Sequence, residues 1–418
     1  MDNLTHSLIG LVAGESIAQT TPANEHGLPV EVRRGLLVAL AVIGGNLPDL
    51  DLLYSYNASS NHKLGYLLQH RGYTHTLLGC VLLASLLYAG TIWWIRWRQL
   101  RSSGRDRLEL ALVALFGTLL HLGMDTLNSY GVHPFWPVEN RWFYGDAVFI
   151  VEPLYWAAAA PLFFVVRGRA ARVVISLALI AAIGLSVASH LVPPVLCGTV
   201  ALLMVGLLVM GARSSARAAA ISSAVLLVGI TATFIFSGHR AARRAESIAG
   251  SAFPADHVID HVLTPLPMNA VCWDLLLLET RGDRYVVRHA MLSNAAAVMP
   301  ARQCPTMFGS QGTAPMVRVA AADSGQIHWL GEFAMSTTTL RTLVDGYCDA
   351  AALMRFARVP FATLPQRRWV VGDLRFDREP GLGMSEIELT SPSVLPCPGS
   401  PPWIAPRSDL LAARKWLP

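Results

Sequence analysis

Long apolar runs dominate the chain as far as Phe236. Several extend for about twenty residues with almost no charge, which is long enough to cross the hydrocarbon core of a bilayer. The runs predict eight helical segments: Leu4–Gln19, Gly35–Tyr54, Thr76–Ile95, Leu108–Asp125, Ala147–Val166, Val173–His190, Pro194–Gly211 and Ala218–Phe236. The first is short enough to be interfacial or re-entrant, and the second is interrupted by Gly44-Gly45-Asn46-Leu47-Pro48. The pattern predicts an all-α polytopic membrane domain.

The pattern changes after Phe236. Residues 239–418 have ordinary polarity, many prolines and glycines, and short alternating runs that are typical of strands. The clearest runs are Arg284–Arg288, Met316–Val319, Trp369–Val371 and Ile387–Leu389. We therefore expect a mainly β extramembrane domain over residues 239–418. The membrane domain has two parts. Residues 1–165 carry the polar motifs described below, and residues 166–238 add further helices.

Composition supports a membrane protein. Only 15% of the residues are charged, whereas about a quarter are charged in an average soluble protein. The net charge of +5 comes almost wholly from arginine, since Lys63 and Lys415 are the only lysines. The arginines cluster at helix ends, where membrane orientation explains them better than nucleic-acid binding does. We expect membrane lipids as partners and no nucleic acid.

The arginines also predict an orientation. They gather on alternate connections: Arg33-Arg34, Arg96 to Arg107, Arg167 to Arg172, and Arg213 with Arg217. The positive-inside rule places these connections in the cytoplasm, which puts both termini and residues 239–418 on the periplasmic or outer side of a bacterial inner membrane. Four cysteines, Cys272, Cys304, Cys348 and Cys397, permit two disulfides in an exported domain, with the pairing left open. The acidic start Met1-Asp2-Asn3 does not predict a cleavable signal peptide.

Five polar motifs stand out in the first 155 residues. They are Asp2-Asn3-Leu4-Thr5-His6, Gly45-Asn46-Leu47-Pro48-Asp49-Leu50-Asp51, His70-Arg71-Gly72-Tyr73-Thr74-His75, His121-Leu122-Gly123-Met124-Asp125, and Gly145-Asp146 running to Glu152-Pro153. In the predicted topology they all fall at the non-cytoplasmic ends of their segments. Buried imidazoles and carboxylates are costly near a bilayer unless they have partners or a function. We therefore expect these motifs to form one site.

The spacing of these residues suits a metal ion. His121 and Asp125 are four apart and share one face of a helix. The break before Asp49 and Asp51 allows both carboxylates to leave the helical path, and Gly72 allows His70 and His75 to converge from a turn. Imidazole with carboxylate suits zinc, and also manganese or iron.

Some of these residues have plainer explanations. His6 alone is more simply an interfacial or hydrogen-bonded histidine. Asp146 and Glu152 are six apart, so one can bind a metal while the other caps a helix or pairs with Arg141. The aromatic segments Phe135-Trp136 and Trp142-Phe143-Tyr144 favour an interfacial belt over a substrate platform.

In this order, the motifs resemble the YdjM-type family of bacterial inner-membrane proteins, which are regarded as metal-dependent hydrolases. The resemblance covers about residues 1–165, and the string His70-Arg71-Gly72-Tyr73-Thr74-His75 is its most specific part. At the last motif the family leads us to expect Asp-Pro, whereas this chain has Glu152-Pro153. The family in turn is similar to zinc-dependent phospholipases C and P1-type nucleases, which use a His-x-x-x-Asp pair like His121 and Asp125 and imply phosphoester hydrolysis.

The resulting hypothesis is a membrane-bound, metal-dependent hydrolase acting on a phosphoester or lipid-linked substrate. One to three divalent ions, zinc first, would be bound by His6, Asp49, Asp51, His70, His75, His121, Asp125, Asp146 and Glu152. Asp49 or Asp51 would act as the general base. Arg71 would neutralise a phosphate or the charge that develops on the substrate, or would be an interfacial arginine that pairs with Asp51 or lipid headgroups. No other cofactor is expected. The alternatives are a non-catalytic metal-binding or transport protein and a membrane anchor for residues 239–418.

Overall fold

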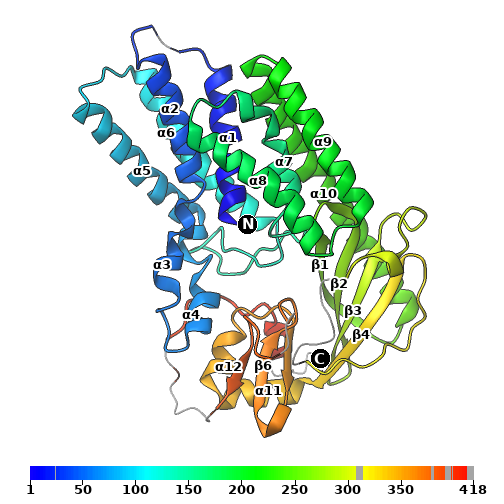
Figure 1. Ribbon diagram of the computed structural model, residues 1–418. Helices are drawn as coiled ribbons and strands as arrows, with labels where there is room; N and C mark the ends of the chain where they lie inside the picture. Colours follow the sequence, from blue (N-terminus) through cyan, green and yellow to red (C-terminus); the bar gives the residue numbers. More distant parts are fainter. Residues whose placement is uncertain (24, 307–313, 378–380, 391–396, 398, 412–418) are drawn as a thin grey trace.

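The long helices of the N-terminal part and the two sheets of the C-terminal part occupy separate parts of the molecule (Figure 1). The computed structural model describes residues 1–23, 25–306, 314–377, 381–390, 397 and 399–411. The principal helices of the membrane part are α1 (Asn3–Thr20), α2 (Val30–Gly44), α5 (Leu77–Trp97), α6 (Gly104–Thr126), α7 (Pro153–Ala158), α8 (Arg169–Ala188), α9 (Pro194–Arg213) and α10 (Ala216–Ala252). Short helices connect them: η1 (Leu47–Asp51), α3 (Leu52–Ser55), α4 (His62–Gln69), η2 (Tyr73–His75) and η3 (Ala160–Phe164).

Five helices in the described ranges, α5, α6, α8, α9 and α10, are long and apolar enough to cross a membrane. The segment from α2 through η1 and α3 is a sixth candidate, bent by 48°. The prediction of eight spans is therefore not confirmed. The predicted segment Ala147–Val166 contains only the short α7 and η3, because Pro161 lacks a backbone N–H and interrupts the helix.

Helices α1, α2 and α6 meet through small residues. A Cβ atom on Gly10 of α1 would lie 2.7 Å from the carbonyl oxygen of Ala41 in α2. A Cβ atom on Gly117 of α6 would lie 3.1 Å from the same oxygen. Larger residues at these two glycines would force the helices apart. This close approach brings together the three helix ends that carry polar motifs.

Helix α10 joins the two parts of the molecule. It continues well past the predicted end at Phe236, to Ala252. Its last turns are rich in alanine, a strong helix former, and Ala241, Ala245 and Ala249 are buried at intervals of four residues. These alanines pack in one hydrophobic core with Trp273 of the first sheet. The helix therefore runs without a break from the apolar helices to the first sheet and packs against it.

The C-terminal part has two antiparallel sheets, in agreement with its predicted β character. The first has the order β1-β2-β3-β4 (His257–Leu266, Asn269–Arg281, Arg284–Ser293 and Ile327–Ser336), and the second has the order β5-β6-β7 (Pro360–Thr363, Trp369–Asp373 and Ile387–Leu389). Short helices α11 (Thr337–Gly346), α12 (Cys348–Leu353) and α13 (Ser408–Leu411) accompany them. The predicted strand Met316–Val319 is reduced to a single bridge between Val317 and Glu332. The cysteines form the disulfides Cys272–Cys304 and Cys348–Cys397.

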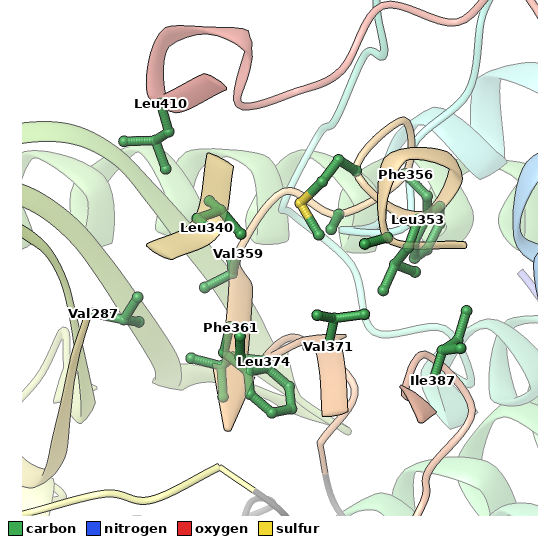
Figure 2. Close-up of a cluster of buried hydrophobic side chains, with 14 of the residues drawn as sticks. Val287, Leu340, Leu353, Phe356, Val359, Phe361, Val371, Leu374, Ile387 and Leu410 are labelled. Atoms are coloured by element: carbon green, nitrogen blue, oxygen red, sulfur yellow. The ribbon is translucent and has the colours of Figure 1, made fainter. Parts of the chain in front are cut away.

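The second sheet shares a hydrophobic core with loops of the membrane part. Figure 2 shows Phe356, Phe361 and other buried side chains at its centre, and Leu67 and Trp142 from the membrane part belong to the same core. The indole N–H of Trp142 donates to the carbonyl of Arg355 over 2.7 Å. Trp142 is therefore a core residue, and the prediction of an interfacial belt is wrong for it. The second sheet and its helices are therefore packed directly on the end of the membrane part that carries the polar motifs.

Candidate metal centre

Asp49 and Asp51 lie where the second membrane segment breaks. Helix α2 ends at Gly44, as the glycines predict, and η1 starts at Leu47 with Pro48 in its first turn. The bend turns this short helix toward the start of α5 and the end of α6. Both carboxylates are buried, with residue exposures of 8% for Asp49 and 0% for Asp51.

The histidines come from two further segments. His75 ends η2 and precedes α5, whose first turn is capped by the hydroxyl of Thr76 accepting from the N–H of Gly79. His121 and Asp125 lie on one face of the last turns of α6, as their spacing predicts. All three side chains are fully or almost fully buried.

Asp49, His75, His121 and Asp125 each offer a ligand atom, and these atoms lie within 4.8 Å of one another. His75 Nε2 is 3.3 Å from Asp49 Oδ1 and 3.3 Å from Asp125 Oδ2. His121 Nε2 is 3.5 Å and 3.6 Å from the same two oxygens, and 3.0 Å from His75 Nε2. A tetrahedral zinc ion with ligands at about 2.0–2.1 Å would space them by about 3.3–3.4 Å. Five of the six distances among the four atoms, 3.0 to 3.6 Å, are therefore close to those of a zinc site.

Both imidazoles are oriented with Nε2 toward this centre. His121 Nδ1 lies 2.7 Å from the carbonyl oxygen of Gly45. Because a carbonyl can only accept, His121 Nδ1 must carry a hydrogen, and in the neutral imidazole the lone pair is then on Nε2. His75 Nδ1 lies 3.2 Å from Asp51 Oδ2. A carboxylate or carbonyl behind the imidazole is the arrangement that orients metal-binding histidines in proteins.

The charges also fit a cation. Asp125 Oδ2 is buried and has no hydrogen-bond partner among the described residues. The three aspartates Asp49, Asp51 and Asp125 also outnumber the two cationic groups beside them, Arg71 and the amino group of Met1. Burial lowers the pKa of His75, but the carboxylates of Asp125, Asp49 and Asp51, each 3.2–3.3 Å from its ring nitrogens, outweigh this and raise the pKa to about 10. An excess of carboxylate that holds a proton so firmly can instead hold a divalent ion.

Asp51 and His70 stand beside this group. Together with Asp49 they form a second set of possible ligands. However, both oxygens of Asp51 already have partners. His70 Nδ1 lies 2.9 Å from Oδ1, and the backbone N–H of Arg71 donates to Oδ2 over 2.8 Å. This geometry favours a supporting role for Asp51, which holds His70 and His75 in place.

His6 and Arg71 complete the surroundings of Asp125. His6 Nε2 lies 3.2 Å from Asp125 Oδ1, and its ring stacks on that of His121 with centroids 3.8 Å apart. The amino group of Met1 contacts the same oxygen. Arg71 Nε lies 3.0 Å from Asp125 Oδ2. His6 belongs to neither of the two ligand sets found among the described residues.

Asp146 and Glu152 lie in other networks, which corrects their grouping with the metal ligands. Both oxygens of Asp146 accept from Arg358, and burial raises the pKa of Asp146. The predicted pairing with Arg141 is not found, since Arg141 pairs with Glu139. Glu152 caps α7 by accepting from the N–H of Leu154, and it also accepts from the N–H of Met268. Burial raises the pKa of Glu152 to about 8.

Three residues near the centre, Asn128, Tyr130 and Trp403, were not identified from the sequence, in which His133 has no partner pattern and is interpreted as structural. Asn128 and Tyr130 follow α6 directly and contact Arg71. His133 lies between Trp142 and Trp403, with ring centroids 3.9 Å and 3.8 Å away. The indole N–H of Trp403 donates to the carbonyl of Leu68, two residues before His70. The position of Asn128 just after Asp125 could have indicated that it lies near the centre. Nothing in the sequence around Trp403 indicates its contacts with Leu68 and His133.

Comparison with known protein families gives a match over the N-terminal part of the chain. Residues 1–193 match the family model described as YdjM inner membrane protein, and this range contains all the candidate ligands. Searches of curated proteins and of solved structures found no match. The similarity to phospholipases C and P1-type nucleases stays a prediction. Over its first 193 residues, the chain is similar to the YdjM inner membrane proteins, and the resemblance carried by its motifs is confirmed over that range.

Proposed function

We propose that this protein is a membrane-bound, metal-dependent hydrolase that acts on a phosphoester in a lipid or lipid-linked substrate. The observation that carries the proposal is the group of four ligand atoms from Asp49, His75, His121 and Asp125, spaced by 3.0 to 3.6 Å where distances are given. These residues would hold one divalent ion, zinc being the best match. A bound divalent ion supplies Lewis acidity and makes water a nucleophile at neutral pH.

The proton in such a reaction needs an acceptor near the centre. Asp49 Oδ2 accepts from the side-chain amide of Asn3 over 3.1 Å, and its other oxygen belongs to the ligand group. His70 is a better candidate than Asp49, because Asp51 Oδ1 accepts the hydrogen on His70 Nδ1 and leaves Nε2 free to take a proton. The Asp51–His70 pair therefore provides the base, with Asp51 as the residue that orients it.

A stack of aromatic rings leads from the surface to His70. Tyr56 is 51% exposed and stacks on Tyr66 with centroids 4.9 Å apart. Tyr66 in turn stacks on His70 at 5.0 Å. Since His70 is 8% exposed, this stack marks the side from which a substrate would approach.

A groove in the membrane part supports a lipid-linked substrate. It has a volume of about 690 Å³ and runs along α1, α2 and the start of α8. Its lining is mostly apolar and includes Leu4 and Ser7, which adjoin Asn3 and thus the contact of Asn3 with Asp49. An acyl or prenyl chain in this groove would leave its polar end beside the centre.

The disulfides support the predicted orientation. Stable disulfides form in oxidising compartments such as the periplasm, and both disulfides lie in the C-terminal part. That part packs on the metal-centre end of the membrane domain. We therefore propose that the centre and residues 239–418 face the periplasm, as the arginines predict.

A hydrolysis assay tests the proposed activity. Zinc-loaded protein in dodecyl maltoside is offered a phosphomonoester, a phosphodiester and a short-chain phospholipid. We expect hydrolysis by the wild type and by His257→Ala, an exposed histidine of β1, and none by His121→Ala or after chelation. Absence of hydrolysis of all three substrates by zinc-loaded wild type would overturn the proposal.

One observation favours a second function. The four ligand residues are at most 8% exposed, which also suits a metal-binding or transport protein that saturates its ion. That function predicts a bound ion without hydrolysis and without an exchangeable water.

A further inference from the structure

Three buried hydrogen-bond donors beside the metal centre have no acceptor. They are Arg71 Nε, Asn128 Nδ2 and the hydroxyl of Tyr130, for which the described part of the chain offers no hydrogen-bond partner. The three residues are only 2%, 3% and 5% exposed. Buried donors are nearly always paired in proteins, because an unpaired one has lost its hydrogen bonds to water without replacement. Three such donors on residues that contact one another point to a ligand.

The contacts within this group define its position. Arg71 Nη1 donates to Asn128 Oδ1 over 2.9 Å, and the backbone N–H of Tyr130 donates to the same oxygen over 2.9 Å. The guanidinium carbon of Arg71 lies 4.8 Å above the ring of Tyr130. Arg71 Nε is also 3.0 Å from Asp125 Oδ2, one of the four ligand atoms, although not in hydrogen-bond geometry. Arg71 Nε therefore borders the metal centre on the side of Asp125, and Asn128 and Tyr130 both contact Arg71.

The backbone holds Arg71 in place at some cost. Its φ is 61°, which is in the left-handed region that residues other than glycine rarely adopt. Its N–H donates to Asp51 Oδ2, and its carbonyl oxygen lies 3.4 Å from His133 Nδ1. Strained backbone of this kind persists where the surroundings determine it, and is concentrated at functional sites. The position of the guanidinium is thus imposed by the residues that also support the metal centre.

Core packing does not explain the polar atoms. The ring of Tyr130 packs with Trp142 and Phe356, which a phenylalanine would do equally well. The side-chain oxygen of Asn128 has two structural partners, but its amide nitrogen has none among the described residues. The unpaired polar groups are the Nε–H of Arg71, the side-chain amide of Asn128 and the hydroxyl of Tyr130. All three can donate hydrogen bonds, and Arg71 carries a positive charge.

This set of donors matches an oxyanion. A phosphate group offers several acceptor oxygens around one centre, and a guanidinium is the protein cation that binds such oxygens best. When a divalent ion occupies the oxygen of Asp125, the charge of Arg71 is available to a second anion. We propose that Arg71, Asn128 and Tyr130 bind the non-bridging oxygens of the substrate's phosphate group. This inference rests on the proposed function and names the group that the site recognises.

Two variants each alter one donor with little change in shape. Tyr130→Phe removes only the hydroxyl. Asn128→Asp keeps the oxygen that accepts from Arg71 and replaces the free amide N–H with a carboxylate oxygen. Tyr144→Phe is the matched control, because the hydroxyl of Tyr144 is also buried without a partner in the described residues, but the ring of Tyr144 packs under Arg358 and not under Arg71.

The experiment is a calorimetric titration of inorganic phosphate into zinc-loaded protein in dodecyl maltoside, with zinc content measured on the same samples. We expect wild type and Tyr144→Phe to bind phosphate alike, Tyr130→Phe to bind about tenfold more weakly, and Asn128→Asp to show no binding. Zinc content should be equal in all four. A second titration compares glycerol 3-phosphate with a short-chain phosphatidylglycerol, and tighter binding of the lipid would identify a lipid headgroup as the source of the phosphate.

Three results would overturn the inference: no phosphate binding by zinc-loaded wild type, unchanged binding by both donor variants, or equal loss in the Tyr144→Phe control. If the wild type binds no zinc, the proposed metal centre fails separately. The same comparison of variants on metal-free protein then decides whether the three donors bind phosphate.

Discussion

The variant Asp51→Asn tests whether Asp51 supports the metal ligands or binds the metal directly. Asp51 accepts from the backbone N–H of Arg71 over 2.8 Å and from the hydroxyl of Thr74 over 3.0 Å, and its two oxygens lie 2.9 Å and 3.2 Å from Nδ1 of His70 and of His75. An asparagine can place its amide oxygen on only one side. Its NH₂ group then faces another donor, and the negative charge behind His75 is lost.

The expected loss follows from this supporting role. Removing a residue that orients a metal-binding histidine weakens metal affinity by about 10 to 100-fold, which corresponds to roughly 1.4–2.7 kcal/mol. The number of ions per chain should stay the same. His75→Ala, which removes a proposed ligand, should abolish binding. Asp106→Asn is the matched control, because Asp106 is equally buried but caps the far end of α6.

Zinc affinity would be measured by competition with a chromogenic chelator. Asp51→Asn is expected to lie between Asp106→Asn, which should equal wild type, and His75→Ala. An affinity within twofold of wild type would show that Asp51 does not support the site. A loss as complete as that of His75→Ala would show that Asp51 binds the metal directly.

Three other predictions concern the surroundings of the centre. Glu152 has a pKa raised by burial from 4.5 to about 8, so its stabilising contribution is complete below pH 4.5 and is lost as pH rises to 8, by at most about 1.4 kcal/mol per pH unit. Melting temperatures of Glu152→Gln, with unchanged zinc content, should therefore exceed those of wild type by a margin that grows up to pH 8, and a margin independent of pH would contradict this. Trp403→Ala should lower the free energy of unfolding by about 3–5 kcal/mol and weaken zinc binding, because Trp403 is fully buried against His133 and Leu68. A variant as stable as wild type, or with unchanged zinc affinity, would argue against support of the centre by the C-terminal part. A cysteine at Ser102, between α5 and α6, should react with a membrane-impermeant maleimide only after the membrane is opened, and labelling in intact cells would invert the topology.

The ligand cluster was predictable because it rests on local patterns. The four-residue interval between His121 and Asp125 places both on one helix face, and the Gly-Gly-Asn-Leu-Pro break frees Asp49 and Asp51. The arginine pattern then predicts that these motifs lie on one side of the membrane. The separation of ligands from supporting residues was not predictable, since it depends on hydrogen bonds that join Asp51 to residues about twenty positions away.

The errors have a common physical cause. Asp146 and Glu152 are bound by Arg358 and Met268, which are 212 and 116 residues away in the chain. Trp142 was predicted to be an interfacial aromatic residue because the second sheet, which buries it, lies in the distant C-terminal part of the chain. A local pattern shows that a polar group or an aromatic ring needs a partner, but the fold decides which distant segment provides it.

The central claim is that Asp49, His75, His121 and Asp125 hold a divalent ion, and elemental analysis of detergent-purified protein tests it most directly. Wild type and His121→Ala would be purified without added metal, with His257→Ala as a control. The account predicts close to one zinc, manganese or iron ion per chain in wild type and in the control, and almost none in His121→Ala. A metal content near zero in wild type, or the same content in His121→Ala, would contradict it.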